Sequence, residues 1–170
     1  MEKNLIRQKN LALRKELNQP LASKVIVSKI LAFEDFLRAK NVLIFYPMKN
    51  EINLLPLIEL IDKNFYLPRV DGDNLLICPY TTNLKKSNFG VFEPCNNPID
   101  NISNIDLVFV PCLAIDKNLN RVGYGKGYYD RLFINPDFKA LKVAVINKEL
   151  LIDTIFVDDF DKKVDFVITN

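Results

Sequence analysis

The chain of 170 residues contains no histidine, only five glycines and only three cysteines. The lack of histidine excludes Ser-His-Asp and Cys-His nucleophilic catalysis, and it excludes every metal site that needs an imidazole ligand. Acid–base chemistry must therefore rely on Asp, Glu, Lys, Tyr or Cys. A bound metal would need oxygen ligands, which favours Mg²⁺ or a similarly hard ion.

The cysteines and the charge balance exclude further classes of protein. Cys78, Cys95 and Cys112 are widely spaced and form no C-x-x-C pair, so we expect neither a disulfide framework nor a four-cysteine zinc site, and we expect a reducing, cytoplasmic location. The net charge of +2 gives no support for nucleic-acid binding. No apolar run approaches the roughly 20 residues that cross a bilayer, and the N-terminus does not read as a signal peptide, so no membrane partner is expected.

Hydrophobic periodicity predicts an α/β fold. The predicted helices span residues 2–17, 23–38, 53–62 and 127–133, and the predicted strands span residues 42–46, 65–70, 75–80, 107–110, 142–146 and 164–168. Ser23 is the expected N-cap of the second helix, and residues 83–104 are expected to form a long irregular connection. Strands that alternate with helices predict one domain over residues 1–170, with a mostly parallel twisted sheet and helices on both faces.

Three of the five glycines stand at positions 123, 125 and 127, within the segment RVGYGKGYYD of residues 121–130. Alternate glycines allow several backbone N–H groups to point at one anion, and a following helix N-terminus adds its dipole. Arg121 and Lys126 add positive charge, and Asp130 is a candidate Mg²⁺ ligand. The spacing is neither the Rossmann nor the P-loop pattern. From the glycines alone, a flexible turn before a helix is as good an interpretation as a phosphate site.

Residues 107–133 resemble the signature region of the 5-formyltetrahydrofolate cyclo-ligase family, also called methenyltetrahydrofolate synthetase. An apolar strand, a proline, an aspartate, a polar turn and the sequence R-x-G-x-G-x-G-Y-Y-D-R follow in the family's order. Similar segments extend along most of the chain, at residues 3–7, 46–51, 67–69, 89–94 and 161–169. Two positions depart from the pattern, because Tyr124 stands where members often have Arg and Phe160 where many have His.

The resemblance implies a Rossmann-like fold, similar to the NagB, RpiA and CoA-transferase type, and a ligase that depends on ATP and Mg²⁺. The implied reaction converts 5-formyltetrahydrofolate (folinic acid) into 5,10-methenyltetrahydrofolate, with release of ADP and phosphate. It passes through a phosphorylated formyl group (an imidate phosphate), which N10 of the folate attacks to close the ring. This chemistry suits a chain without histidine, since phosphoryl transfer depends on positioning and charge neutralisation more than on a strong base. The expected partner is the folate, with or without a polyglutamate tail, and the expected state is a monomer.

The resemblance also assigns site residues. The ATP-binding positions are Lys3, Asn4, Leu5, Ile6, Arg7, Arg121, Val122, Gly123, Tyr124, Gly125, Lys126, Gly127, Tyr128 and Tyr129. The substrate-binding positions are Tyr46, Glu51, Tyr124, Gly125, Lys126, Gly127 and Tyr128, with residues 89–94 expected beside the pterin. The catalytic positions are Lys126, Arg121 and Tyr128, and the metal positions are Asp130 and Asp161.

The predicted strand ends agree with this assignment, because Tyr46, Glu51 and Pro111 fall at or just after them and open α/β sheets bind ligands there. Simpler interpretations stay open for several residues. Lys3 and Arg7 are compatible with a solvated helix edge, Asp161 with an acidic turn, and one of the two tyrosines at 128 and 129 with the core. Two other functions also stay open: a non-catalytic folate- or nucleotide-binding protein on the same fold, and a sugar-phosphate isomerase.

Overall fold

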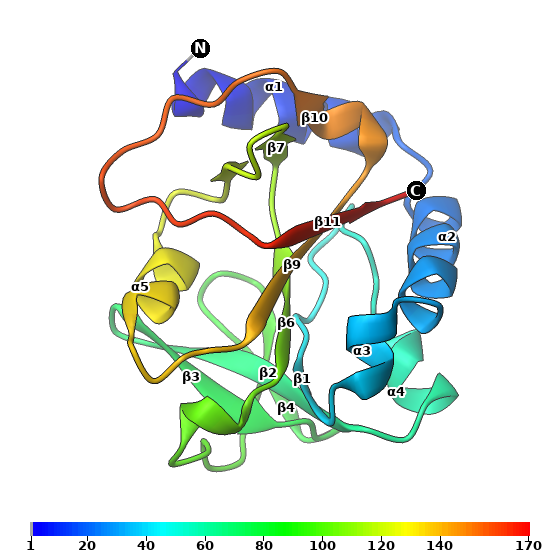
Figure 1. Ribbon diagram of the computed structural model, residues 1–170, viewed down its shortest axis with the longest axis vertical. Helices are drawn as coiled ribbons and strands as arrows, with labels where there is room; N and C mark the ends of the chain where they lie inside the picture. The colour runs from blue at the N-terminus through cyan, green and yellow to red at the C-terminus, as the bar shows by residue number, and fades with distance from the viewer. Residues whose placement is uncertain (1) are drawn as a thin grey trace.

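A six-stranded sheet forms the centre of the molecule in the computed structural model, which describes residues 2–170 (Figure 1). The strand order is β11-β9-β6-β1-β2-β3, and all neighbours are parallel except β2 and β3. The strands are β1 (Asn41–Leu43), β2 (Asn64–Asp71), β3 (Asn74–Pro79), β6 (Leu107–Pro111), β9 (Leu141–Ile146) and β11 (Phe166–Thr169). The prediction of a mostly parallel sheet is confirmed.

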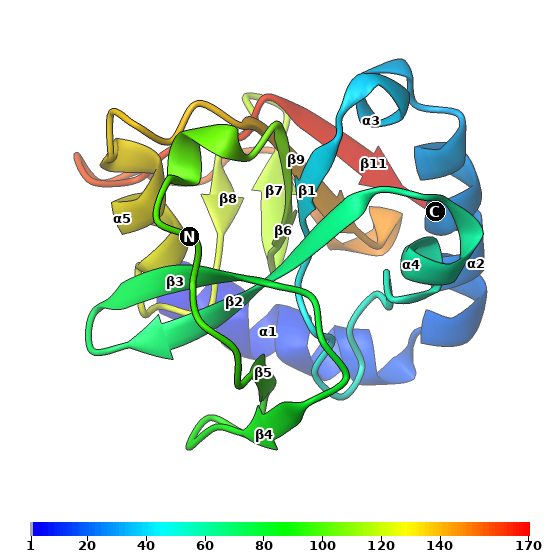
Figure 2. The ribbon, with the colours of Figure 1, turned by 90° about the horizontal axis from the view of Figure 1, so that it is seen from below.

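Helices cover both faces of this sheet, as predicted (Figure 2). The reason is visible along β6, where Leu107 and Phe109 join one core cluster and Val108 and Val110 join the other. The first cluster packs under α2 (Gln19–Leu31), α3 (Glu34–Arg38) and α4 (Pro56–Leu60). The second packs under α5 (Tyr128–Ile134) and the 3₁₀ turn η1 (Ile102–Asn104).

Helix α1 (Lys3–Glu16) packs instead against a small second sheet, beyond the carboxyl end of β6. This sheet has the order β10-β7-β8 and consists of β7 (Ala114–Asp116), β8 (Arg121–Val122) and β10 (Leu151–Ile152), which follows the 3₁₀ turn η2 (Lys148–Leu150). Ile6 joins Ala114, Val122 and Ile155 in a separate buried cluster. The N-terminal helix is thereby held at the edge of the sheet where ligands of parallel α/β folds bind.

The second helix begins four residues earlier than predicted and is interrupted. The side chain of Asn18 accepts a hydrogen bond from the backbone N–H of Leu21 and caps α2, so Pro20 lies in the first turn of a helix, where its missing N–H costs nothing. Ser23 is inside α2, and its hydroxyl oxygen accepts a hydrogen bond from the backbone of Asn53. The predicted span 23–38 is therefore two helices, α2 and α3.

Two segments expected to be irregular contain hairpins. Within residues 83–104, β4 (Leu84–Lys86) pairs with β5 (Phe92–Pro94), and in the stretch before the glycines β7 pairs with β8. These strands have only two or three residues, too few to show an alternating pattern in the sequence. The predicted strands at 65–70 and 75–80 pair with each other as an antiparallel hairpin, β2 and β3, with β3 at the sheet edge.

No helix formed by residues 2–170 is both long and apolar enough to cross a membrane. The three cysteines are all free.

Candidate active site

A cavity of about 1200 Å³ opens at the carboxyl ends of β1 and β6. In the strand order, β1 lies between β2 and β6, so the chain leaves β1 in one direction and returns on its other side. This is the point in an open α/β sheet where a crevice forms. The wall is built from α1, the segment after β1, the β2–β3 and β4–β5 hairpins, the loop before α5 and the loop before β11.

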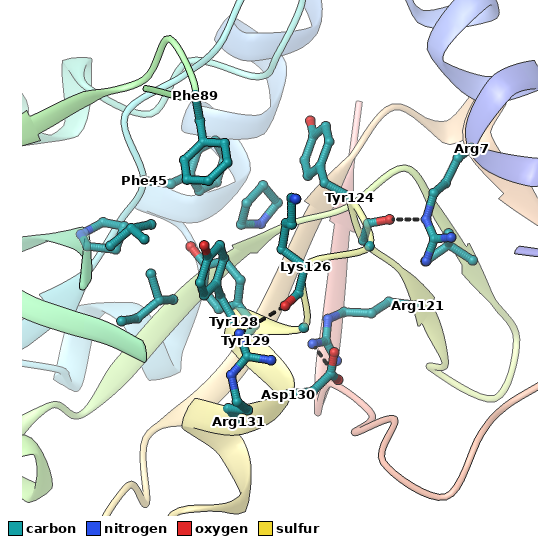
Figure 3. Close-up of a pocket in the computed structure, with 18 of the residues that line it drawn as sticks. Arg7, Phe45, Phe89, Arg121, Tyr124, Lys126, Tyr128, Tyr129, Asp130 and Arg131 are labelled. Atoms are coloured by element: carbon teal, nitrogen blue, oxygen red, sulfur yellow. Dashed lines mark hydrogen bonds and ion pairs between the residues drawn. The ribbon is translucent and has the colours of Figure 1, made fainter. Parts of the chain in front are cut away.

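The glycine loop between β8 and α5 forms one side of the cavity (Figure 3). Gly125 has φ +95° and Gly127 has φ +69°, which are left-handed conformations that only glycine adopts at low cost. A Cβ atom at Gly125 would lie 3.3 Å from the guanidinium carbon of Arg7. The loop is therefore curved by its glycines and closely packed against α1, which a flexible turn would not require.

Lys3 and Arg7, one turn apart on α1, both face this cavity. The Lys3 ammonium donates hydrogen bonds to Asp158, at 2.5 Å, and to Asp161. Arg7 Nε donates to the carbonyl oxygen of Gly123 at 2.9 Å. Asn4 also lines the cavity, whereas Leu5 is exposed and Ile6 is buried in the core. Of the N-terminal positions assigned to ATP, the structure brings three to the cavity and two away from it.

Arg121 and Asp130 form an ion pair below the loop, with Nη2 of the arginine 2.8 Å from Oδ1 of the aspartate. The same Oδ1 accepts the backbone N–H of Lys162 at 3.0 Å, and Arg121 donates to the carbonyl oxygen of Lys162. The guanidinium also lies 5.0 Å from the ring centroid of Phe133. Arg121 thus fastens the loop before β11 to the start of α5. Lys126 differs, because it is exposed and has no ion-pair partner among residues 2–170.

Glu51 and Tyr124 meet in the same cavity. Glu51 is 7% exposed, its Oε1 accepts the Tyr124 hydroxyl, and its Oε2 accepts the backbone N–H of Met48 at 2.6 Å. Burial raises the pKa of Glu51 above its usual value, and the hydrogen bonds from Tyr124 and Met48 and the charge of Arg14 partly oppose this rise. Burial also raises the pKa of the Tyr124 hydroxyl, which remains a donor at neutral pH.

Aromatic side chains also line the cavity. Tyr46 lies 5.2 Å from Phe92, and Tyr128 lies edge-on to Phe89 at 6.4 Å, both measured between ring centroids. The segment 89–94 reaches the cavity through Phe89, Val91, Phe92 and Glu93. Tyr129 touches the cavity but packs against Phe133 and the core, and burial raises its pKa. Tyr128 is thus the more accessible of the two tyrosines.

Several cavity residues had no role assigned from the sequence, among them Phe45, Pro68, Arg131, Phe156 and Phe160. Arg14 does not line the cavity, yet it contacts Tyr124 and lies close to Glu51. One signal for Arg14 existed, because it falls on the helical stripe of Lys3 and Arg7. Cys112 is fully buried, and burial raises the pKa of its thiol to about 12, so it carries no nucleophilic role.

The two candidate metal ligands, Asp130 and Asp161, both line the cavity, next to the glycine loop and to Lys3. Within residues 2–170 there is no group of three or more side chains suited to hold a metal ion. Mg²⁺ needs fewer, because it binds through one or two carboxylates and completes its shell with phosphate oxygens and water. The oxygen donors present at this end of the cavity fit that requirement.

The fold and the cavity together define an α/β protein with one large ligand site at the switch point of a parallel sheet. The sequence model of the 5-formyltetrahydrofolate cyclo-ligase family matches residues 1–170, and the chain belongs to this family. It is an enzyme of the ligase class, as the resemblance implied.

Individual relatives are similar over most of their length. The chain is 32% identical to 5-formyltetrahydrofolate cyclo-ligase of Haemophilus influenzae over 73% of this chain and 72% of the relative. It is 29% identical to 5-formyltetrahydrofolate cyclo-ligase of Mycoplasma genitalium over 100% of this chain and 99% of the relative. The solved structure of Aquifex aeolicus 5,10-methenyltetrahydrofolate synthetase superimposes with a TM-score of 0.85 at 30% identity, over 98% of this chain and 89% of that chain.

Proposed function

We propose that this chain converts 5-formyltetrahydrofolate into 5,10-methenyltetrahydrofolate and consumes one ATP in doing so. The observation that carries the proposal is that one cavity is lined by a cationic glycine loop, a buried carboxylate and several aromatic rings. Its volume of about 1200 Å³ exceeds the range of roughly 300–1,000 Å³ that one small ligand occupies. Two ligands that must react with each other fit such a space.

The proposed reaction has two steps. The oxygen of the formyl group carried by N5 attacks the γ-phosphorus of ATP. The bond from this phosphorus to the β,γ-bridging oxygen breaks, and ADP leaves. The lone pair of N10 then attacks the activated formyl carbon, the carbon–oxygen bond breaks, phosphate leaves and N10 loses its proton. The second step is intramolecular, so a site that holds the folate in the folded shape supplies much of its rate.

The ATP end of the site consists of positive charge and glycine backbone. Lys126 is the cation best placed for the transferred phosphoryl group, because it rises from the glycine loop without an ion-pair partner within residues 2–170 (Figure 3). Lys3 and Arg7 supply further charge from α1. Asp130 and Asp161 are proposed to hold Mg²⁺, which would neutralise phosphate charge when bound. Stabilisation of the phosphoryl charge is the main demand of the first step.

The folate end consists of Glu51 with Tyr46, Tyr124 and Tyr128. An ionised carboxylate only accepts hydrogen bonds, which matches the N–H donors on the edge of a pterin ring. The aromatic pairs Tyr46–Phe92 and Tyr128–Phe89 provide faces and edges for the flat ring and for the benzoyl group of the folate. We further propose that the enzyme acts as a one-domain monomer in the cytoplasm and accepts polyglutamylated folate.

The test is a spectrophotometric assay with 5-formyltetrahydrofolate, ATP and Mg²⁺, which follows the near-ultraviolet absorbance of the methenyl product. We expect product only when all three are present, with one ADP released per product. Folded protein that binds the folate and forms no product would overturn the proposal in favour of a binding protein. Turnover of a sugar phosphate without ATP would favour an isomerase.

A further inference from the structure

Helix α1 buries a polar stripe as well as its apolar residues. Arg14 is 6% exposed and Asn10 is 3% exposed, although each lies on the face of the helix that carries Lys3 and Arg7. Burial of a guanidinium is costly unless polar groups surround it. Asn10 Nδ2 donates to the carbonyl oxygen of Leu113 at 2.7 Å, which explains its burial as an anchor to the segment after β6. Arg14 has a different surrounding.

The Arg14 guanidinium contacts two of the residues proposed for the folate end of the cavity, Tyr124 and Glu51. Its Nη1 donates to the Tyr124 hydroxyl oxygen at 2.7 Å and lies 3.7 Å from Glu51 Oε1. The guanidinium carbon is 5.6 Å from the centroid of the Tyr124 ring. The Tyr124 hydroxyl in turn donates to Glu51 Oε1. The three side chains form one directed chain of hydrogen bonds from the arginine to the carboxylate.

Arg14 cannot itself reach a ligand in the large cavity, because Tyr124 and Glu51 line that cavity and Arg14 does not. Arg14 also borders a separate space of about 10 Å³, shared with Glu51 and Cys112, which is no larger than one water molecule. Any effect of Arg14 on the reaction must therefore pass through Tyr124 or Glu51.

We propose that Arg14 is a positioning residue, which holds the Tyr124 hydroxyl and keeps the Glu51 carboxylate ionised and correctly oriented for the folate. This proposal rests on the proposed function, because it takes Glu51 as the acceptor for the pterin. Lys3 and Arg14 are eleven residues apart, about 16 Å along a helix, so α1 serves the nucleotide with its first turn and the folate with its last.

The groups that act on the charge of Glu51 are few. Arg14 is the only cation paired with it among the described residues, and Tyr124, Tyr129 and Cys112 are neutral neighbours at pH 7 because burial raises the pKa of each. Loss of the arginine therefore removes the one charge that favours the carboxylate. The pKa of Glu51, already raised by burial, must then rise further.

The test compares Arg14→Met, Arg14→Lys and the control Arg38→Met, an exposed arginine paired only with Glu34 on α3. Melting temperature, kcat and the separate KM values for folate and ATP are measured, together with the pH profile of kcat/KM for folate. For Arg14→Met we expect the folate KM to rise at least tenfold, the ATP KM to stay within twofold, and the acidic limb of the profile to move to higher pH. Arg14→Lys should move the acidic limb of the kcat/KM profile back towards its wild-type position without restoring the folate KM.

A merely structural arginine would give another result. If Arg14→Met lowers the melting temperature and raises both KM values alike, with the acidic limb unmoved, the positioning role is overturned. Wild-type enzyme in the same assay separates the two proposals: no methenyl product there means that the proposed function has failed. Calorimetric titration with 5-formyltetrahydrofolate then decides the role of Arg14 alone, since weaker binding by Arg14→Met than by Arg38→Met supports it and equal binding refutes it.

Discussion

Lys3 and Asp161 are 158 positions apart in the sequence and form an ion pair at the mouth of the cavity. Asp158 accepts a hydrogen bond from the same ammonium group. Burial lowers the pKa of Lys3, but the hydrogen bonds and charges of these two aspartates oppose it and leave the pKa raised. The charge of Lys3 is thus committed to carboxylates in the free protein. If Asp161 holds Mg²⁺ as proposed, the Lys3 ammonium would be free to contact the phosphates of ATP.

Replacement of Lys3 by methionine should therefore weaken ATP use selectively. We expect the KM for ATP to rise about tenfold, which corresponds to about 1.4 kcal/mol of binding, while the KM for folate is unchanged. Lys9→Met, which removes an exposed lysine of the same helix, is the control. Equal KM values for ATP in the two variants would show that Lys3 serves only to fasten the chain ends.

Lys126→Ala should act on kcat. If its ammonium group stabilises the transferred phosphoryl group, its loss should reduce kcat by about 10²–10³-fold, as for other groups that stabilise developing charge. The melting temperature should not change, because the side chain is exposed. Single-turnover measurements with Lys139→Ala as the control, another exposed lysine, check this prediction. A variant with unchanged kcat would remove Lys126 from the catalytic residues.

Gly125→Ala should separate backbone strain from loss of function. A side chain at φ +95° costs about 1–2 kcal/mol, and its Cβ would also press on Arg7. Gly72→Ala is a matched control, since Gly72 has φ +58° and nothing within 4 Å of the added atom. Both variants should lose a similar amount of unfolding free energy, measured in urea. Only Gly125→Ala should raise the KM for ATP, and a similar rise in both would refute the role of the loop.

Asp116→Asn should destabilise the fold in a pH-dependent way. The carboxylate accepts hydrogen bonds from the backbone N–H groups of Asn118, Asn120 and Ile155 and from the Asn120 side chain. Burial raises the pKa of Asp116, but these hydrogen bonds lower it by more, so the pKa is depressed in the folded protein. The ionised Asp116 therefore contributes fully to the free energy of unfolding above its pKa in the unfolded chain, about 3.9. This contribution is lost as the pH falls through its lower pKa in the folded protein.

Urea denaturation at two pH values checks this prediction. We expect Asp116→Asn to lose about 2 kcal/mol of unfolding free energy at pH 7, and the difference from the wild type to shrink below about pH 4. The control is Asp137→Asn, an exposed aspartate whose side chain has no hydrogen-bond partner among residues 2–170. A difference that stays constant down to pH 3 would show that the charge of Asp116 does not matter.

The sequence was sufficient to predict the features that depend on local pattern. The buried strands β6 and β9, the strands β2 and β3 and the glycine-rich start of α5 follow from apolar runs and turn chemistry. The family motif added the positions of many, though not all, of the cavity residues. What these signals share is that a few consecutive residues are enough to define them.

Features that depend on distant residues were not predictable. Arg14 looks like one more solvated charge on an amphipathic helix, and only Tyr124 and Glu51, brought together by the fold, make its burial possible. The early start of α2 depended on a choice between Pro20 as a stop and Pro20 as a first-turn residue, which the chain settles through the cap at Asn18. The role of Arg121 as a clamp likewise needed the backbone of Lys162.

Helix α1 comes before the rest of the site in the sequence, and its Lys3 pairs with residues 155 and 158 positions further on. A ribosome-bound chain that stops before residue 158 has made α1 and the glycine loop but cannot pair Lys3 with Asp158 or Asp161. Such long-range closure is a late event in folding, because the entropy of the long intervening loop must be lost first. The Lys3 side of the cavity should consequently form only after residues 158–161 have been synthesised.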